Sequence, residues 1–304
     1  MTLPTPLPLG ADDPLAAWML AEARQFLARG HRPVFALNGP VGAGKSSLAL
    51  QLQAVLASAG VQMAVASIDD AYLPATHRRE AMAGNPFGVT RVPPGSHDPK
   101  ALVSALSHWQ QQPVSEGIRI APLQLPRFDK TLLAGEGDRT APWCGHAEAV
   151  LLEGWMLGCR PWDEHALLAE PLVQALTHQE QQWLLRCNRA LEAYQPLWIL
   201  QDRLLVLVPS RWSLPRRWRF QAEARQRRSG GGWLSPTQLQ NLVEATMKSL
   251  PPKLFQEPLL QQADWVRVLD GRRRCRWQGS GDAWRTQNDQ ASSPCSSATG
   301  YTKP

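Results

Sequence analysis

The chain has 304 residues, of which 43% are hydrophobic and 19% are charged, and its formal net charge is +6. This length allows one large α/β domain or two small ones, each with a substantial core. No apolar run approaches the roughly 20 residues of a membrane span, and the early residues do not resemble a signal peptide. Because the five cysteines show neither paired nor metal-type spacing, we expect free thiols and a cytoplasmic protein.

The first elements follow directly from local signals. Residues 1–12 are rich in proline and are predicted to be a flexible N-terminus. Asp13 and Pro14 suit the cap and first turn of a helix that should run to Arg29. An apolar strand is predicted at 34–37, immediately before a glycine-rich segment.

That glycine-rich segment fits the phosphate-binding P-loop pattern of Gly, four residues and Gly-Lys-Ser. Its glycines allow the backbone N–H groups to approach phosphate oxygens, and the helix predicted after it adds a positive dipole end. The lysine can reach the β- and γ-phosphates, and the serine can bind Mg²⁺. The predicted nucleotide-binding residues are Gly39, Pro40, Val41, Gly42, Ala43, Gly44, Lys45, Ser46 and Ser47.

The rest of the chain alternates apolar strands with helices and two long irregular connections. Further helices are expected over 98–112, 179–200 and 213–228 and from 235 onward, and the connections over 71–97 and around 125–139. Further strands are predicted at 62–68, 149–152, 203–208 and 264–269.

This alternation predicts a three-layer α/β fold with a five-stranded, mostly parallel sheet. From the P-loop and the arginine-rich helix at 213–228, we further expect the P-loop kinase type of this fold, with a helical lid. The kinase domain is expected over 13–278, and 279–304 are expected to form a disordered tail because they are polar and low in complexity. Ligands of such folds bind at the carboxyl ends of the strands. The P-loop, Asp69-Asp70 and Glu153 each follow a predicted strand, so we expect them to meet there.

Phosphoryl transfer requires charge neutralisation and a correctly placed nucleophile. Ser46 and Glu153 are the candidate Mg²⁺ ligands, because both supply oxygen atoms near the phosphates. Asp69 or Asp70 is the candidate base for the attacking hydroxyl. Either aspartate could instead be a solvated strand end or a helix cap.

Several cations lie in the long connections and could bind an anionic substrate. The candidates are His97, Arg127, Lys130 and Arg139, although His97-Asp98 could also be a capping turn and each arginine a solvated charge. The arginine-rich helix at 213–228 is predicted to be a lid over ATP, whereas Arg273 is expected to be a surface residue. The net positive charge could indicate nucleic acid, but the P-loop favours an anionic nucleotide.

Six stretches of the sequence resemble D-glycerate 3-kinase of the plant and cyanobacterial type, a branch of the phosphoribulokinase and uridine kinase group of P-loop kinases. The resemblance spans roughly residues 34 to 270. The stretches are Ser67–Leu73, Pro94–Asp98, Leu125–Lys130, Gly137–Arg139, Leu152–Gly158 and Trp218–Glu223.

The resemblance implies ATP, Mg²⁺ and D-glycerate as reactants, 3-phosphoglycerate as product and a place in photorespiration. It implies that Asp69 is the base, that Glu153 serves the metal and that Arg219 belongs to the lid. Asp70 is expected to brace the loop, contact a substrate hydroxyl or touch metal-bound water, and both Asp70 and Tyr72 belong to the predicted substrate-binding set.

Other functions remain open from the sequence. The chain could be a kinase for another hydroxylated metabolite such as a nucleoside, pantothenate or a sugar phosphate, or a P-loop protein that uses ATP as a switch. We expect ATP and a small hydroxy acid as partners, with neither nucleic acid nor a membrane. The sequence leaves the oligomeric state open.

Overall fold

A computed structural model describes residues 9–10, 12–113, 119–228 and 234–292 of the chain. Most of the predicted flexible N-terminus, residues 1–8 and 11, therefore lies outside the described residues. Within them, no helix combines the length and apolarity needed to cross a bilayer. Four of the five cysteines are described, and all four are free thiols, as expected.

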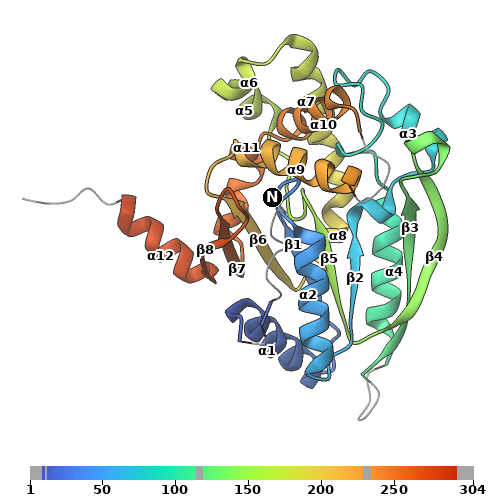
Figure 1. The fold of residues 1–304 in the computed structure, drawn as a ribbon, viewed down its shortest axis with the longest axis vertical. Coiled ribbons are helices and arrows are strands. Elements are labelled where there is room, and N and C mark those ends of the chain that lie inside the picture. The colour runs from blue at the N-terminus through green and yellow to red at the C-terminus, as the bar shows by residue number, and fades with distance from the viewer. Residues whose placement is uncertain (1–8, 11, 114–118, 229–233, 293–304) are drawn as a thin grey trace, which may run out of the picture.

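The central element is a six-stranded sheet with the order β2-β5-β1-β6-β7-β8 (Figure 1). The first five strands in this order are parallel and are the five that the sequence predicts, whereas β8 pairs antiparallel with β7 and was not predicted. The strands are β1 Val34–Asn38, β2 Met63–Ser67, β5 Ala149–Gly154, β6 Arg203–Pro209, β7 Trp265–Leu269 and β8 Cys275–Ser280.

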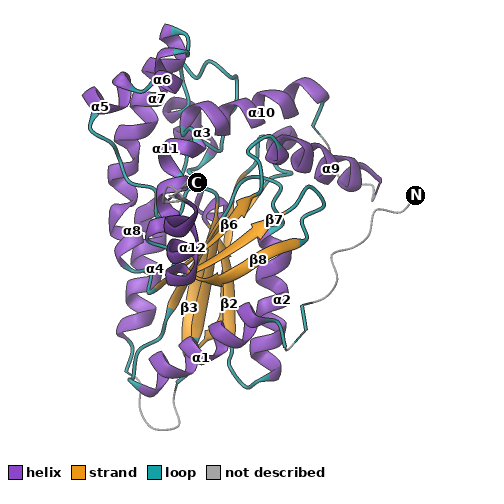
Figure 2. Cartoon of the chain, turned by 90° about the vertical axis from the view of Figure 1, so that its left-hand side faces the viewer, coloured by secondary structure: helices purple, strands orange, loops and turns teal. Residues whose placement is uncertain are grey.

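Helices cover both faces of this sheet, which gives the predicted three layers (Figure 2). Successive side chains of a strand point to opposite faces, and β1 shows the consequence: Val34 and Ala36 belong to one core, Phe35 and Leu37 to the other. The helices are α1 Pro14–Ala28, α2 Lys45–Ser58, α3 Ala75–Ala81, α4 Pro99–Gln111, α5 Glu164–Ala169, α6 Pro171–Gln174, α7 His178–Ala190, α8 Gln195–Ile199, α9 Leu214–Arg228, α10 Pro236–Ser249, α11 Pro252–Phe255 and α12 Gly281–Ser292.

The predicted helix starts are confirmed by capping hydrogen bonds. The Asp13 carboxylate accepts a hydrogen bond from the backbone of Leu15, and the Asp98 carboxylate accepts one from Ala101. Such caps satisfy donors that have no partner within the helix, so short polar residues fix where helices begin.

The second long connection is a β-hairpin and not the irregular stretch that the sequence indicated. Strands β3 (Ala121–Asp129) and β4 (Asp138–Ala147) pair antiparallel beside the main sheet (Figure 1). Pro122 and Pro126 obscured the strand pattern, because proline lowers strand propensity. The hairpin forms because alternate side chains of β3, including Leu123 and Leu125, are buried in the core.

The prediction of a disordered tail over 279–304 is wrong for its first part. The segment 281–292 forms α12, and residues 293–304 lie outside the described part of the chain. The ring of Trp284 packs edge-on against Trp277 at 5.3 Å between centroids. Arg285 donates a hydrogen bond to the Gln261 carbonyl at 2.8 Å. These two side chains connect α12 to β8 and to η4 (Glu257–Gln261), contacts that the polar composition of the segment does not reveal.

Candidate active site

The P-loop lies between β1 and α2, and its backbone conformation requires glycine. Gly42 has a φ of +76°, and a Cβ atom there would lie 2.7 Å from the backbone nitrogen of Arg219 in α9. Glycine is therefore required both for the conformation and for the close approach of α9. The Lys45 ammonium group donates hydrogen bonds to the Gly39 and Pro40 carbonyls at 2.9 and 3.2 Å.

Ser46 and Glu153 are brought together as the sequence predicts. Glu153 is at the end of β5, and Ser46 in the first turn of α2 donates a hydrogen bond to its Oε1 at 2.8 Å. Hydroxyl and carboxylate oxygens suit Mg²⁺, which usually binds only one or two protein oxygens together with water and substrate phosphates. Ser46 and Glu153 supply oxygens of this kind, and both line the same cavity as the P-loop lysine.

Asp69 follows β2 in the short 3₁₀-helix η1 (Ile68–Ala71) and carries two close donors. The Tyr72 hydroxyl donates to Oδ1 at 2.9 Å, and the Lys130 ammonium donates to Oδ2 at 2.8 Å. Burial alone would raise the pKa of Asp69, but the charge of Lys130 and the contact with His97 hold that pKa well below its usual value. The carboxylate is therefore ionised at neutral pH and able to accept a proton.

These groups share one cavity of about 250 Å³ at the carboxyl ends of the strands. The convergence of the P-loop with the ends of β2 and β5, expected from the sequence, is present in the structure. The cavity is lined by Val41, Gly42, Lys45, Ser46, Ser67, Asp69, Tyr72, Arg91, Val92, Lys130, Glu153, Gly154, Trp155, Arg219 and Leu242.

Of the predicted substrate-binding residues, Tyr72 and Lys130 line this cavity and the other four do not. Arg127 is paired with Asp70, with 3.1 Å between Nη1 and Oδ2. Arg139 donates hydrogen bonds to the Tyr72 carbonyl at 2.8 Å and to the Asp98 carboxylate at 3.1 Å. Its guanidinium group therefore connects the backbone at Tyr72 to the start of α4.

His97 also differs from its expected position. Its side chain has no exposed surface and stacks on the Tyr72 ring at 4.4 Å between centroids. His97 therefore does not line the cavity itself but packs against Tyr72, which does.

Six lining residues were not predicted as site residues: Ser67, Arg91, Val92, Gly154, Trp155 and Leu242. Arg91 comes from the loop before α4 and donates to the Gly135 and Glu136 carbonyls at 3.1 and 2.7 Å. Trp155 follows the strand end that carries Glu153, a position that could have indicated it, whereas Leu242 in α10 has no local signal of function.

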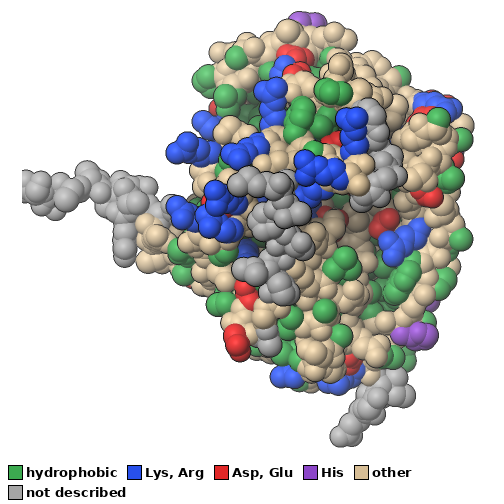
Figure 3. Space-filling model, viewed as in Figure 1, with side chains coloured by type: hydrophobic (Ala, Val, Ile, Leu, Met, Phe, Trp, Pro, Cys, Tyr) green, Lys and Arg blue, Asp and Glu red, His purple; other side chains and the backbone are tan. Residues whose placement is uncertain are grey.

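Helix α9 covers the P-loop, as a lid would. The side chain of Arg219 lines the cavity and pairs with Glu223 one turn later, at 3.0 Å. Lysine and arginine side chains gather across the face where α9 and the β7–β8 turn lie (Figure 3). This face would attract an anionic nucleotide.

The expectation that Arg273 is a surface residue is wrong. Its guanidinium donates to the Gly42 carbonyl in the P-loop and to the Trp218 carbonyl in α9, both at 2.7 Å. Burial lowers its pKa to about 10. Arg273 comes from the turn between β7 and β8, and it connects the P-loop to the lid helix.

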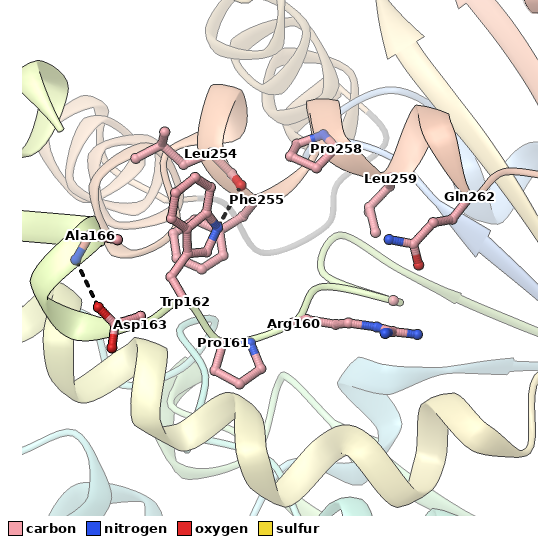
Figure 4. Close-up of a pocket in the computed structure, with 11 residues that line it drawn as sticks. Arg160, Pro161, Trp162, Asp163, Ala166, Leu254, Phe255, Pro258, Leu259 and Gln262 are labelled. Carbon is pink, nitrogen blue, oxygen red and sulfur yellow. Dashed lines mark hydrogen bonds between the residues drawn. The ribbon is translucent and has the colours of Figure 1, made fainter. Parts of the chain in front are cut away.

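A second cavity, of about 290 Å³, lies between the segment before α5 and the helices α11 and η4 (Glu257–Gln261) (Figure 4). Its wall is largely apolar, and the Trp162 indole there donates to the Leu254 carbonyl at 3.0 Å. This cavity contains neither the P-loop nor the strand-end carboxylates, so we assign the candidate active site to the first cavity.

Comparison with known proteins gives a consistent result. No family model matches the chain. It is 30% identical over 250 residues to the chloroplastic D-glycerate 3-kinase of Arabidopsis thaliana, which covers 78% of this chain and 52% of that protein. It is 29% identical to the uncharacterized kinase mug58 of Schizosaccharomyces pombe, over 66% of this chain and 74% of that protein.

Among solved structures, the D-glycerate 3-kinase of Cryptococcus neoformans matches with a TM-score of 0.73 and 23% identity, over 88% of this chain and 99% of that one. The chain spans about half the length of the Arabidopsis protein. In sequence it is similar to a plant D-glycerate 3-kinase, and in structure it has the P-loop kinase fold of a fungal D-glycerate 3-kinase.

Proposed function

We propose that the chain is an ATP-dependent kinase that transfers a phosphoryl group to D-glycerate and forms 3-phosphoglycerate. The observation that carries this proposal is the position of Asp69 with Lys130 in the same cavity as the P-loop lysine. A base, a substrate cation and a phosphate-binding loop thus face one another. The names of the similar proteins support glycerate as the acceptor.

The P-loop end of the cavity suits the nucleotide. The N-terminus of α2 directs backbone N–H groups toward the phosphates, and Lys45 exchanges the carbonyls of Gly39 and Pro40 for phosphate oxygens. Arg219, from the helix that covers the P-loop, also lines the cavity, where its charge stabilises the transferred group. Mg²⁺, held by Ser46 and Glu153, would neutralise phosphate charge when bound.

The opposite end suits a small hydroxy acid. Lys130 and Arg91 are the cations on that wall, and both can bind a carboxylate. In this structure Lys130 pairs with Asp69. When Lys130 instead pairs with the substrate carboxylate, it lowers the pKa of Asp69 less, and Asp69 becomes a stronger base. The same movement would bind glycerate and activate the group that takes its hydroxyl proton.

The test is ATP turnover by the purified protein with Mg²⁺ and a panel of hydroxy acids, nucleosides, pantothenate and sugar phosphates, with products identified by mass. We expect phosphoglycerate from D-glycerate. Product from another acceptor instead would overturn the assignment of glycerate and leave a kinase. ATP binding without turnover on any acceptor would indicate a switch protein.

The Lys45→Ala variant is the control for the nucleotide site. We expect it to lose turnover, because it lacks the charge that stabilises the transferring phosphoryl group, while melting near the wild-type temperature. Near-normal activity in this variant would show that the phosphates bind elsewhere. A cytoplasmic location and a role in photorespiration stay predictions from the sequence.

A further inference from the structure

Behind Asp69, away from the cavity, lies a buried histidine that the reaction described above does not use. The Nε2 atom of His97 lies 3.8 Å from Oδ1 of Asp69, and among the described residues it has no hydrogen-bond partner. A buried polar atom without a partner costs free energy, so its position calls for an explanation. Nε2 is directed at the carboxylate oxygen that already accepts from the Tyr72 hydroxyl.

The other ring nitrogen determines which tautomer faces Asp69. The oxygen of Tyr194 lies 3.0 Å from Nδ1 and accepts a hydrogen bond from the backbone N–H of Gly95, also at 3.0 Å. Tyr194 thus already accepts one hydrogen bond, and among the described residues Nδ1 of His97 is the acceptor within reach of its hydroxyl proton. The proton of the neutral ring must then be on Nε2, facing Asp69.

The opposite tautomer fits the surroundings poorly. It would turn the Nε2 lone pair toward an ionised carboxylate, and the described residues offer the Tyr194 proton no second acceptor. Ser96, whose Oγ lies 3.3 Å from Nδ1, could accept an Nδ1 proton, but only through a longer contact than that with Tyr194. Burial lowers the pKa of His97, with Lys130 and Arg78 acting in the same direction and Asp69 opposing them, so the ring is neutral at pH 7.

We propose that His97 is a positioning residue for Asp69, held by Tyr194 with its Nε2–H directed at Oδ1. In the reacting complex this N–H and the Tyr72 hydroxyl both donate to Oδ1, which leaves Oδ2 to take the proton from the substrate hydroxyl. The contact is longer than a hydrogen bond here, and such contacts commonly shorten when substrates bind. The catalytic part rests on the proposed function, whereas the tautomer does not.

This arrangement has a chemical consequence. A carboxylate with two donors on one oxygen is fixed in rotation, so its other oxygen points in one direction. Lys130, the partner of Oδ2, is half exposed and free to exchange, whereas the partners of Oδ1 are buried. The structure thus distinguishes Oδ1 of Asp69, which is held in place, from Oδ2, which reacts. His97 then orients the base, whereas the sequence led us to expect that it contacts the substrate.

The tautomer can be tested without any enzymatic activity. Protein labelled with ¹⁵N-histidine would be studied by NMR at neutral pH. A ring nitrogen that carries a proton has a different ¹⁵N chemical shift from one that does not, so the spectrum shows which nitrogen is protonated. We expect His97 to carry its proton on Nε2. In Tyr194→Phe, which lacks the donor to Nδ1, we expect a substantial fraction of the Nδ1–H form. A wild-type His97 with its proton on Nδ1 would overturn the proposal.

The catalytic part is tested by a matched pair of variants. Glutamine can place an N–H near the position of Nε2, whereas leucine of similar size cannot. We expect His97→Leu to lower kcat about ten- to hundredfold, as for loss of a hydrogen bond to a charged group, with little change in the KM for ATP. His97→Gln should recover most of this loss at a similar melting temperature. Equal losses in both variants would contradict a donor role.

The two proposals can fail separately. If wild-type protein phosphorylates another acceptor, the kinetic comparison is made with that acceptor, and only the identity of the substrate changes. If wild-type protein phosphorylates none, the proposed function is wrong. The NMR result still decides whether His97 directs an N–H at Asp69.

Discussion

Asp69 and Asp70 are neighbours in the chain, yet their carboxylates have different surroundings. Asp69 lines the cavity and pairs with Lys130, whereas Asp70 lies outside it and pairs with Arg127. The Asp69→Asn change preserves shape and can still accept from Tyr72, but an amide cannot take a proton. We expect kcat to fall about 10²–10⁴-fold, equivalent to about 3–5 kcal/mol in the activation barrier.

The Asp70→Asn change is the matched control, and the structure limits its effect. Its ion pair with Arg127 is partly exposed, with 40% of the arginine and 19% of the aspartate side chain accessible. Burial raises the pKa of Asp70 and the charge of Arg127 opposes this rise. An ion pair in such surroundings contributes at most about 1 kcal/mol, so kcat should change less than about fivefold. Any larger effect is expected in the KM for glycerate.

Both variants would be assayed by steady-state ADP release at saturating ATP over a range of glycerate concentrations. Calorimetry would check that ATP still binds, and thermal melting would check that both variants fold. A larger kcat loss for Asp70→Asn would reverse the two roles. Unchanged kcat in both variants would show that neither aspartate removes the proton.

Three further predictions concern Arg273, helix α12 and Lys130, whose contacts only the structure shows. Arg273→Ala should raise the KM for ATP at least about tenfold, because it loses charged hydrogen bonds to the P-loop and to α9. Arg272→Ala, at an exposed neighbour, should have little effect on the KM for ATP, and equal KM values in the two variants would refute the role of Arg273 in connecting the P-loop to α9. Deleting 281–304 should destabilise the domain by about 2 kcal/mol, since α12 buries part of a tryptophan and makes hydrogen bonds. The melting temperature should then fall by about 4 °C, and an unchanged value would show that α12 contributes nothing. Lys130→Met should shift the acid limb of the kcat/KM profile to higher pH. Lys130 is the largest cause that lowers the pKa of Asp69, so without it Asp69 takes up its proton at a higher pH and the rate is lost sooner on acidification. An unchanged limb, measured with glycerate from pH 4 to 8, would contradict this coupling.

The sequence by itself determined the features that depend on neighbouring residues. The P-loop could be predicted because its glycine, lysine and serine positions act within eight residues, Gly39–Ser46. The parallel strands and the carboxylates Asp69 and Glu153 at their ends could be predicted because apolar strands alternate with helices. The carboxyl ends of parallel strands meet at one edge, so the convergence followed from the order of elements.

The tertiary structure decided which distant side chains meet. Lys130 reaches Asp69 because the chain before and after the β3–β4 turn pairs as a hairpin, despite prolines that concealed its strands. Arg273 contacts Gly42 from 231 positions away, and Tyr194 contacts His97 from 97 positions away.

These contacts depend on how sheet order and helix packing place whole elements, whereas periodicity and capping act over only a few residues. A solvated arginine and a bridging one can therefore have the same local sequence. The same holds for a histidine that binds substrate and one that lies behind the base. Only the packing of the elements distinguishes them.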